Sequence, residues 1–127
     1  MWRLWRRKSK FNSWTKRFVK LSDDPDTPGA VMRSHIRQGL DSNDINTHGA
    51  AMLSAMGIAR GIHEQTGDGT AIECMNRYDY PGFLEAWERA EFLDAQTVEG
   101  RLATGRPTRA DSYHKAGKAQ IVKSKDS

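Results

Sequence analysis

Residues 79–102 carry apolar side chains at the spacing of an amphipathic helix, and this pattern constrains the fold more than any other in the chain. Asp79 is suited to cap the start of such a helix and Pro81 to occupy its first turn, while Gly105 and Pro107 stop it. The apolar residues that share its buried face are Tyr80, Phe83, Leu84, Trp87 and Ala90, extended by Leu93, Val98 and Leu102. The acidic residues that mark its solvated side are Glu85, Glu88 and Glu91.

Two earlier segments also indicate helices. Residues 30–40 predict a short helix in which Val31, Ile36 and Leu40 are available for burial. A second helix is expected to start at a cap formed by Ser42 or Asp44, to include the Ala- and Met-rich stretch 49–62, and to end at the turn 66–70. The residues expected in the core of this second helix are Met52, Met56, Ile58, Ala59 and Ile62.

The composition limits the chain to one small core. It has 127 residues, of which 37% are hydrophobic and 28% charged, and its mean hydropathy is -0.76. Burial on this scale does not offset the entropy of ordering the whole chain. We therefore predict an all-α fold with a few short helices around a small core, and basic ends that are disordered or ordered only by a partner.

Charge divides the chain into parts of opposite sign. The first 20 residues hold eight Lys or Arg and no acid, residues 21–100 hold five Arg and fourteen acids, and residues 101–127 hold seven bases and two acids, so the net charge of +4 hides a strong partition. The predicted organisation is a basic aromatic arm (1–21), an acidic Pro-containing linker (22–29), an acidic helical domain (30–104) and a basic flexible tail (105–127).

The basic aromatic arm is the first candidate binding segment. The residues that fall at helical intervals among its bases are Leu4, Phe11, Trp14, Phe18 and Leu21. Four interpretations stay open for this stripe: packing on the chain's own core, docking on a partner, lying at a membrane surface, and stacking on unpaired bases. An Arg-rich, acid-free start also resembles an organellar transit peptide, which would be cleaved. The candidate binding residues of the arm are Trp2, Arg3, Trp5, Arg6, Arg7, Lys8, Lys10, Phe11, Trp14, Lys16, Arg17 and Phe18.

The linker and the tail have simpler patterns. Asp23, Asp24 and Asp26 lie between prolines in a turn-rich linker, and one hypothesis is that they pair with the basic arm when no partner is bound. The tail has one aromatic residue, Tyr113, so a solvated tail and a binding tail are equally favoured. Its candidate binding residues are Lys115, Lys118, Lys123 and Lys125.

Catalytic and metal-binding motifs are not recognisable in the sequence. The four histidines are scattered, and His63 beside Glu64 lacks the second histidine of a helical zinc site. Cys74 is the single cysteine, so an inert buried thiol is its expected role. No Walker loop or serine elbow occurs. We expect no catalytic residues, no metal and no cofactor, and we expect neither a membrane-spanning helix nor a secretory signal.

The middle of the chain resembles the internal scaffolding proteins of small single-stranded DNA phages, the microviruses of the gokushovirus type. The resemblance covers roughly residues 40–103. The residues that carry it are Asn43, Asp44, Ile45 and Asn46, the turn Gly67–Asp68, Asp79 and Tyr80 at a helix start, then Leu84, Ala90, Glu91 and Arg101. The family's Arg-x-Arg-Phe and Asn-Asp-Pro elements are absent after this helix. The resemblance implies a non-enzymatic protein that binds coat pentamers from inside and promotes procapsid assembly.

The sequence therefore favours a capsid-assembly protein whose partners are coat protein or other assembly subunits. It would act in the cytoplasm, the host cytoplasm if viral, as part of a larger assembling particle. The alternative is a nucleic-acid-binding accessory subunit of a virion or ribonucleoprotein that holds single-stranded nucleic acid with its basic ends.

Overall fold

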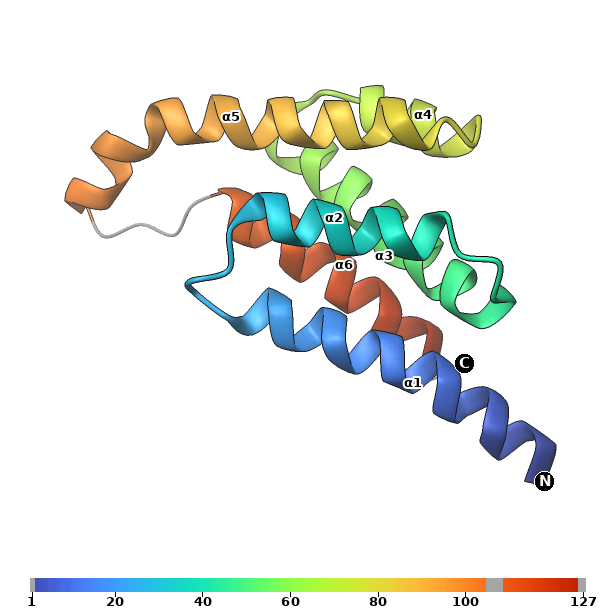
Figure 1. Cartoon of the computed structure of the whole chain (residues 1–127). Coiled ribbons are helices and arrows are strands. Elements are labelled where there is room, and N and C mark those ends of the chain that lie inside the picture. The colour runs from blue at the N-terminus through green and yellow to red at the C-terminus, as the bar shows by residue number, and fades with distance from the viewer. Residues whose placement is uncertain (1, 105–108, 126–127) are drawn as a thin grey trace.

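The structure is a computed structural model (Figure 1) that describes the backbone of residues 2–104 and 109–125 and the side chains of residues 13–95 and 109–123. Six helices and no strand occur in these described ranges. They are α1 (Trp2–Asp23), α2 (Gly29–Leu40), α3 (Ile45–Thr66), α4 (Thr70–Asn76), α5 (Tyr80–Thr104) and α6 (Arg109–Lys125). The prediction of an all-α fold around a small core is confirmed.

Short polar residues set the helix boundaries that the sequence indicated. The Asp44 side chain accepts a hydrogen bond of 3.0 Å from the backbone N–H of Thr47 and so caps α3. That helix ends at Gly67, whose φ of 79° lies in the left-handed region that glycine adopts without strain. Asp79 accepts a 3.0 Å hydrogen bond from the N–H of Gly82 at the start of α5. These three predicted boundaries are confirmed.

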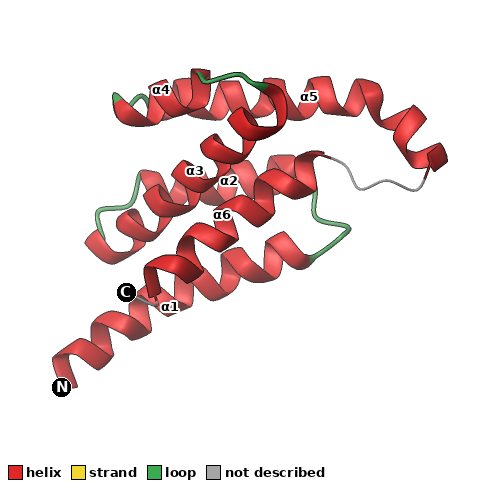
Figure 2. Cartoon of the chain, turned by 180° about the vertical axis from the view of Figure 1, so that it is seen from behind, coloured by secondary structure: helices red, strands yellow, loops and turns green. Residues whose placement is uncertain are grey.

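The core is built from one face of every helix. Figures 1 and 2 show α5 and α4 along one side of the molecule and α1 along the other, with α2, α3 and α6 between them. The fully buried large side chains are Phe18 of α1, Met32 and Ile36 of α2, Ile58 and Ile62 of α3, Met75 of α4, Phe83 and Trp87 of α5, and Tyr113 and Ile121 of α6. The core therefore depends on both basic ends as well as on the acidic middle.

The predicted flexible tail is instead the helix α6, which packs between α1 and α3. Its Tyr113 and Ile121 are buried, and glycines bring its backbone close to α3. A β-carbon added to Gly57 would lie 2.6 Å from the backbone oxygen of Ala116, and one added to Gly117 would lie 3.0 Å from the backbone oxygen of Ser54. The composition of the tail did not indicate this contact, because glycine and alanine allow the close approach and large apolar residues are few in the segment.

Three further expectations about single residues were wrong. Val31 is 44% exposed because the buried stripe of α2 runs through its neighbour Met32. Leu93 is 54% exposed, and the next residue, Asp94, is buried. Glu91, which was assigned to the solvated side of α5, lies on the face of Trp87 one turn earlier and is half-buried. The helix was predicted correctly, but the predicted polar face is displaced by about one residue from the face that is exposed in the structure.

Candidate nucleic-acid interface

The described part of α1 separates aromatic from basic side chains. Phe18 is fully buried and Trp14 is half-buried against the core, with 5.5 Å between their stacked ring centroids. Lys16, Arg17 and Lys20 are exposed. Trp14 and Phe18 therefore pack on the chain's own core. Phe18 is fully buried and cannot contact a partner, whereas the binding role of the half-buried Trp14 stays a prediction. Of the interpretations left open for the arm, packing accounts for this part of it.

A histidine of α2 completes the aromatic cluster. The His35 ring stacks on Trp14, with 4.7 Å between centroids, and is 6% exposed. Its Nε2 atom has no hydrogen-bond partner. Burial, and next the positive charge of Arg17, lower the pKa of His35 from 6.5 to about 4. His35 is therefore neutral at pH 7, and the contact between α1 and α2 is apolar in character.

The described part of α6 contributes a second set of bases. Lys115 and Lys123 are exposed, and the ammonium of Lys118 lies 2.9 Å from the nearer carboxylate oxygen of Asp23 at the end of α1. This ion pair joins the outer sides of the two neighbouring helices. The expected pairing of the acidic linker with the basic arm is thus replaced, for Asp23, by pairing with the C-terminal helix.

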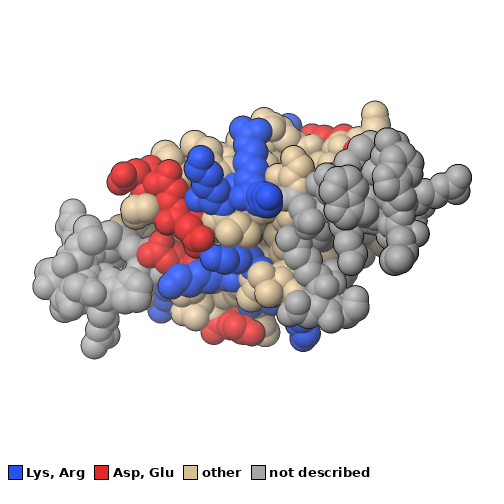
Figure 3. Space-filling model, turned by 90° about the horizontal axis from the view of Figure 1, so that it is seen from below, with Lys and Arg blue, Asp and Glu red and all other residues tan. Residues whose placement is uncertain are grey.

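Together α1 and α6 form one surface, which we call the basic face and define by Lys16, Arg17, Lys20, Lys115, Lys118 and Lys123. Figure 3 shows Lys and Arg side chains gathered across the middle of the surface on the α1 side of the molecule, with acidic side chains grouped beside them. All eight lysines of the chain fall within α1 or α6. Such an array attracts phosphate groups and repels cations.

Sequence reasoning missed two bases here: Lys20, which belongs to the basic face, and Arg60, which lies near it. Arg60 of α3 is exposed and donates a 3.2 Å hydrogen bond from Nη1 to Gln120 of α6. Nothing in the local sequence around Arg60 indicated this, because the approach depends on the glycine contact between α3 and α6. The remaining predicted binding residues lie outside the described side chains: Trp2, Arg3, Trp5, Arg6, Arg7, Lys8, Lys10, Phe11 and Lys125.

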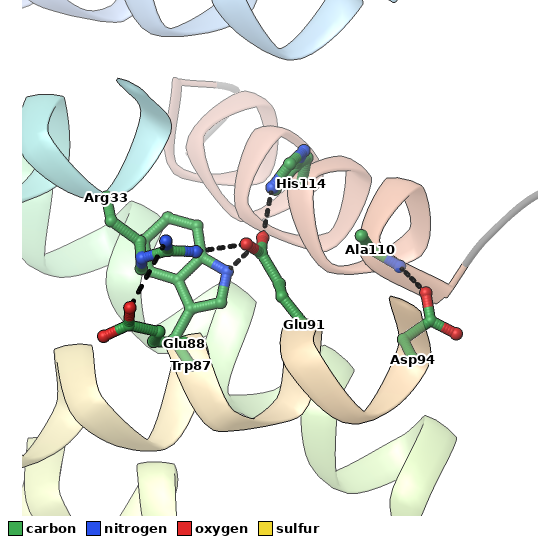
Figure 4. A network of polar contacts seen from close by, with 7 residues as sticks. All are labelled: Arg33, Trp87, Glu88, Glu91, Asp94, Ala110 and His114. Carbon is green, nitrogen blue, oxygen red and sulfur yellow. Dashed lines mark hydrogen bonds and ion pairs between the residues drawn. The ribbon is translucent and has the colours of Figure 1, made fainter. Parts of the chain in front are cut away.

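A polar network inside the molecule links α2, α5 and α6 (Figure 4). The carboxylate of Glu91 accepts a hydrogen bond from Arg33 and one of 2.7 Å from Trp87 Nε1, and lies 3.0 Å from His114 Nε2. Close by, Asp94 accepts a 3.1 Å hydrogen bond from the backbone N–H of Ala110 at the start of α6. Three of these contacts join α5 to α2 or α6, and the hydrogen bond from Trp87 holds the Glu91 carboxylate in place within α5. We therefore interpret the network as structural.

The surface formed by the described residues has other hollows. A groove of about 420 Å³ between α2 and α5 is lined by apolar residues such as Leu84 and by charged ones such as Arg37 and Glu88. No group of three or more His, Cys, Asp or Glu residues suited to a metal ion occurs among the described residues. Within the same residues, no helix is long and apolar enough to cross a membrane.

The residues that carry the resemblance to phage scaffolding proteins have general structural roles here. Asp44 and Asp79 cap helices, Gly67 ends one, and Glu91 belongs to the internal network. Any protein with helix boundaries at these positions has use for such residues. The chain matches no protein-family model, no curated protein and no solved structure.

Proposed function

We propose that this chain is a non-enzymatic accessory protein that binds nucleic acid through the basic face of α1 and α6. The observation that supports this most is the joining of two basic helices into one exposed surface, although Lys16 and Lys115 are 99 residues apart in sequence. Nucleic-acid phosphates are the common biological partner for an extended surface of this charge.

The basic face favours contact with phosphates over contact with bases. The aromatic rings described on α1, Trp14 and Phe18, are engaged in the core and do not supply an open stacking platform. Lysine ammonium groups act as point charges on flexible stems, which suits sequence-independent contact. We expect the described face to bind strands of different sequence with similar affinity and to lose affinity steeply as salt increases.

The capsid-assembly role is the second candidate function. It is favoured by the order of the scaffold-like residues, which coincide with the starts of α3 and α5. In that role the helices α2 to α5 would contact coat protein, and the basic face would contact packaged single-stranded DNA. Both candidates therefore require the same phosphate-binding surface and differ in whether coat protein binds as well.

The test is the salt dependence of binding to a fluorescein-labelled, mixed-sequence single-stranded DNA, followed by anisotropy. The variant Lys16→Gln/Lys20→Gln/Lys115→Gln removes three charges from the face. Its log–log salt slope should be shallower than that of the wild type by about 2, at about 0.7 for each phosphate contact with a single strand. The matched control Arg37→Gln/Arg77→Gln/Arg89→Gln removes three exposed charges elsewhere and should keep the wild-type slope.

Two outcomes would contradict the proposal. One is the absence of salt-dependent binding by the wild-type protein. The other is an equal loss of slope in the two triple variants, because net charge alone would then explain the binding. Pull-down of coat protein or other subunits from the native source, with and without nuclease, separates the two candidate functions.

A further inference from the structure

Asp23 occupies an unusual place for an acidic residue. It is the last residue of α1, where the partial negative charge of the helix end disfavours a carboxylate. Both of its carboxylate oxygens accept hydrogen bonds from Lys118 Nζ, at 3.0 and 2.9 Å. The two side chains are 59% and 34% exposed, so the ion pair is open to solvent and to ions.

The segment that follows extends the negative charge. Asp24 and Asp26 are exposed, and the turn is held by the hydrogen bond of 2.9 Å from the Asp26 N–H to the Asp24 carboxylate. We call Asp23, Asp24 and Asp26 the acidic edge. It lies where α1 ends, whereas the sequence of the first half of α1 is rich in Arg and Lys. The basic face is therefore bounded by acid at the Asp23 end, and the sequence of α1 toward its other end carries further bases and no acid.

We propose that Asp23 competes with nucleic-acid phosphate for Lys118, and that the acidic edge ends the nucleic-acid footprint at this side of the basic face. The Asp23 carboxylate binds the Lys118 ammonium group, which a phosphate would otherwise contact. A bound strand then follows α1 away from Asp23 and toward the N-terminus. This inference rests on the proposed function, and it adds a direction and an internal competitor to it.

The size of the effect follows from the exposure of the pair. Solvent-exposed ion pairs contribute little, because water and salt screen them and their side chains lose entropy. Removing the competitor should therefore tighten binding about two- to fivefold at low salt. It should also make one more ammonium group available, which steepens the salt slope by about 0.7 on a single strand.

The experiment compares Asp23→Asn with Asp41→Asn on the labelled single-stranded DNA. Asp41 is an exposed acid at the C-terminal end of α2 and lies 4.0 Å from Arg37, so each variant loses one negative charge from an ion pair at the C-terminal end of a helix. Only Asp23→Asn should tighten binding and steepen the slope. Because the substitution relieves an unfavourable charge at the end of α1, its melting temperature should not fall.

A second comparison uses Lys118→Gln and Lys115→Gln, which alter one exposed or half-exposed lysine each on the same helix. In the wild-type background Lys118→Gln should weaken binding less than Lys115→Gln does. In the Asp23→Asn background the two losses should become equal. This change isolates the coupling between Asp23 and Lys118.

The inference is overturned if Asp41→Asn tightens binding as much as Asp23→Asn, or if the Lys118 loss is the same in both backgrounds. In those cases binding itself remains, and the proposed function stands without the competitor. If neither the wild type nor Asp23→Asn binds nucleic acid, the proposed function and the inference fail together.

Discussion

The first and last helices carry the same sign of charge but enter the core in different ways. In α1 the inward side chains are aromatic, and Trp14 and Phe18 stack with His35 of α2. In α6 the inward side chains are Tyr113 and Ile121, and the glycine contact with α3 lets the backbone itself approach. The comparison teaches that the charge of a segment describes its outer surface and leaves its buried surface undetermined.

The largest test of this comparison removes the buried ring of α6. Tyr113→Ala should lower the free energy of unfolding by about 3 to 5 kcal/mol, because a fully buried aromatic side chain leaves a cavity. Urea denaturation measures it. The exposed neighbour variant Lys115→Ala should change the free energy by less than about 0.5 kcal/mol. A Tyr113→Ala protein as stable as the wild type would mean that residues 109–125 form a flexible tail after all.

The docking of α1 should be sensitive to acid. His35 has a folded-state pKa of about 4 and an ordinary value of 6.5, so the unfolded chain binds the proton first as the pH falls. Titration of His35 therefore leaves the free energy of unfolding nearly unchanged above pH 6.5. Between pH 6.5 and pH 4 it should lower that free energy by about 2 to 3 kcal/mol. Urea denaturation across this range should show the loss in the wild type.

The control variant His35→Phe keeps a ring beside Trp14 and removes the titrating group. Its stability should fall less between pH 6.5 and 4 than that of the wild type, and the difference is the contribution of His35. Identical pH profiles for the two proteins would contradict the assignment of acid sensitivity to this contact.

The smallest of the stability effects tests the close approach of α6 to α3. Gly57→Ala places a β-carbon against the backbone oxygen of Ala116 and should destabilise the fold by about 1 to 3 kcal/mol. Gly49 lies in the same helix with no atom within 4 Å of the added carbon. Gly49→Ala should instead stabilise it by about 0.5 to 1 kcal/mol, as expected for alanine in a helix interior. Equal effects at the two positions would count against the tight contact.

Much of the fold could be predicted because local sequence determines helix boundaries. Asp44, Gly67 and Asp79 act within a few residues of themselves, so their positions indicated where α3 ends and where α3 and α5 begin. The burial of Phe83 and Trp87 also followed from helical spacing. These features depend on contacts between near neighbours in the chain.

The remainder depended on contacts between distant residues. Glu91 is half-buried because Arg33 and His114 approach it from other helices, and no local pattern announces them. Nothing in the local sequence marked Gly57 and Gly117 as contact residues, although together they let α6 approach α3 closely. The same holds for the candidate interface. Its lysines were predicted individually except for Lys20, but their union into one face and the pairing of Lys118 with Asp23 required the fold.

The central claim is that α1 and α6 form a single phosphate-binding face, and lysine footprinting tests it most directly. Because all eight lysines lie in these two helices, reductive methylation followed by mass spectrometry reports on every lysine of the face. Bound single-stranded DNA should protect Lys16, Lys20, Lys115 and Lys123 together. Protection restricted to Lys8 and Lys10, with the α6 lysines as reactive as in the free protein, would contradict the claim.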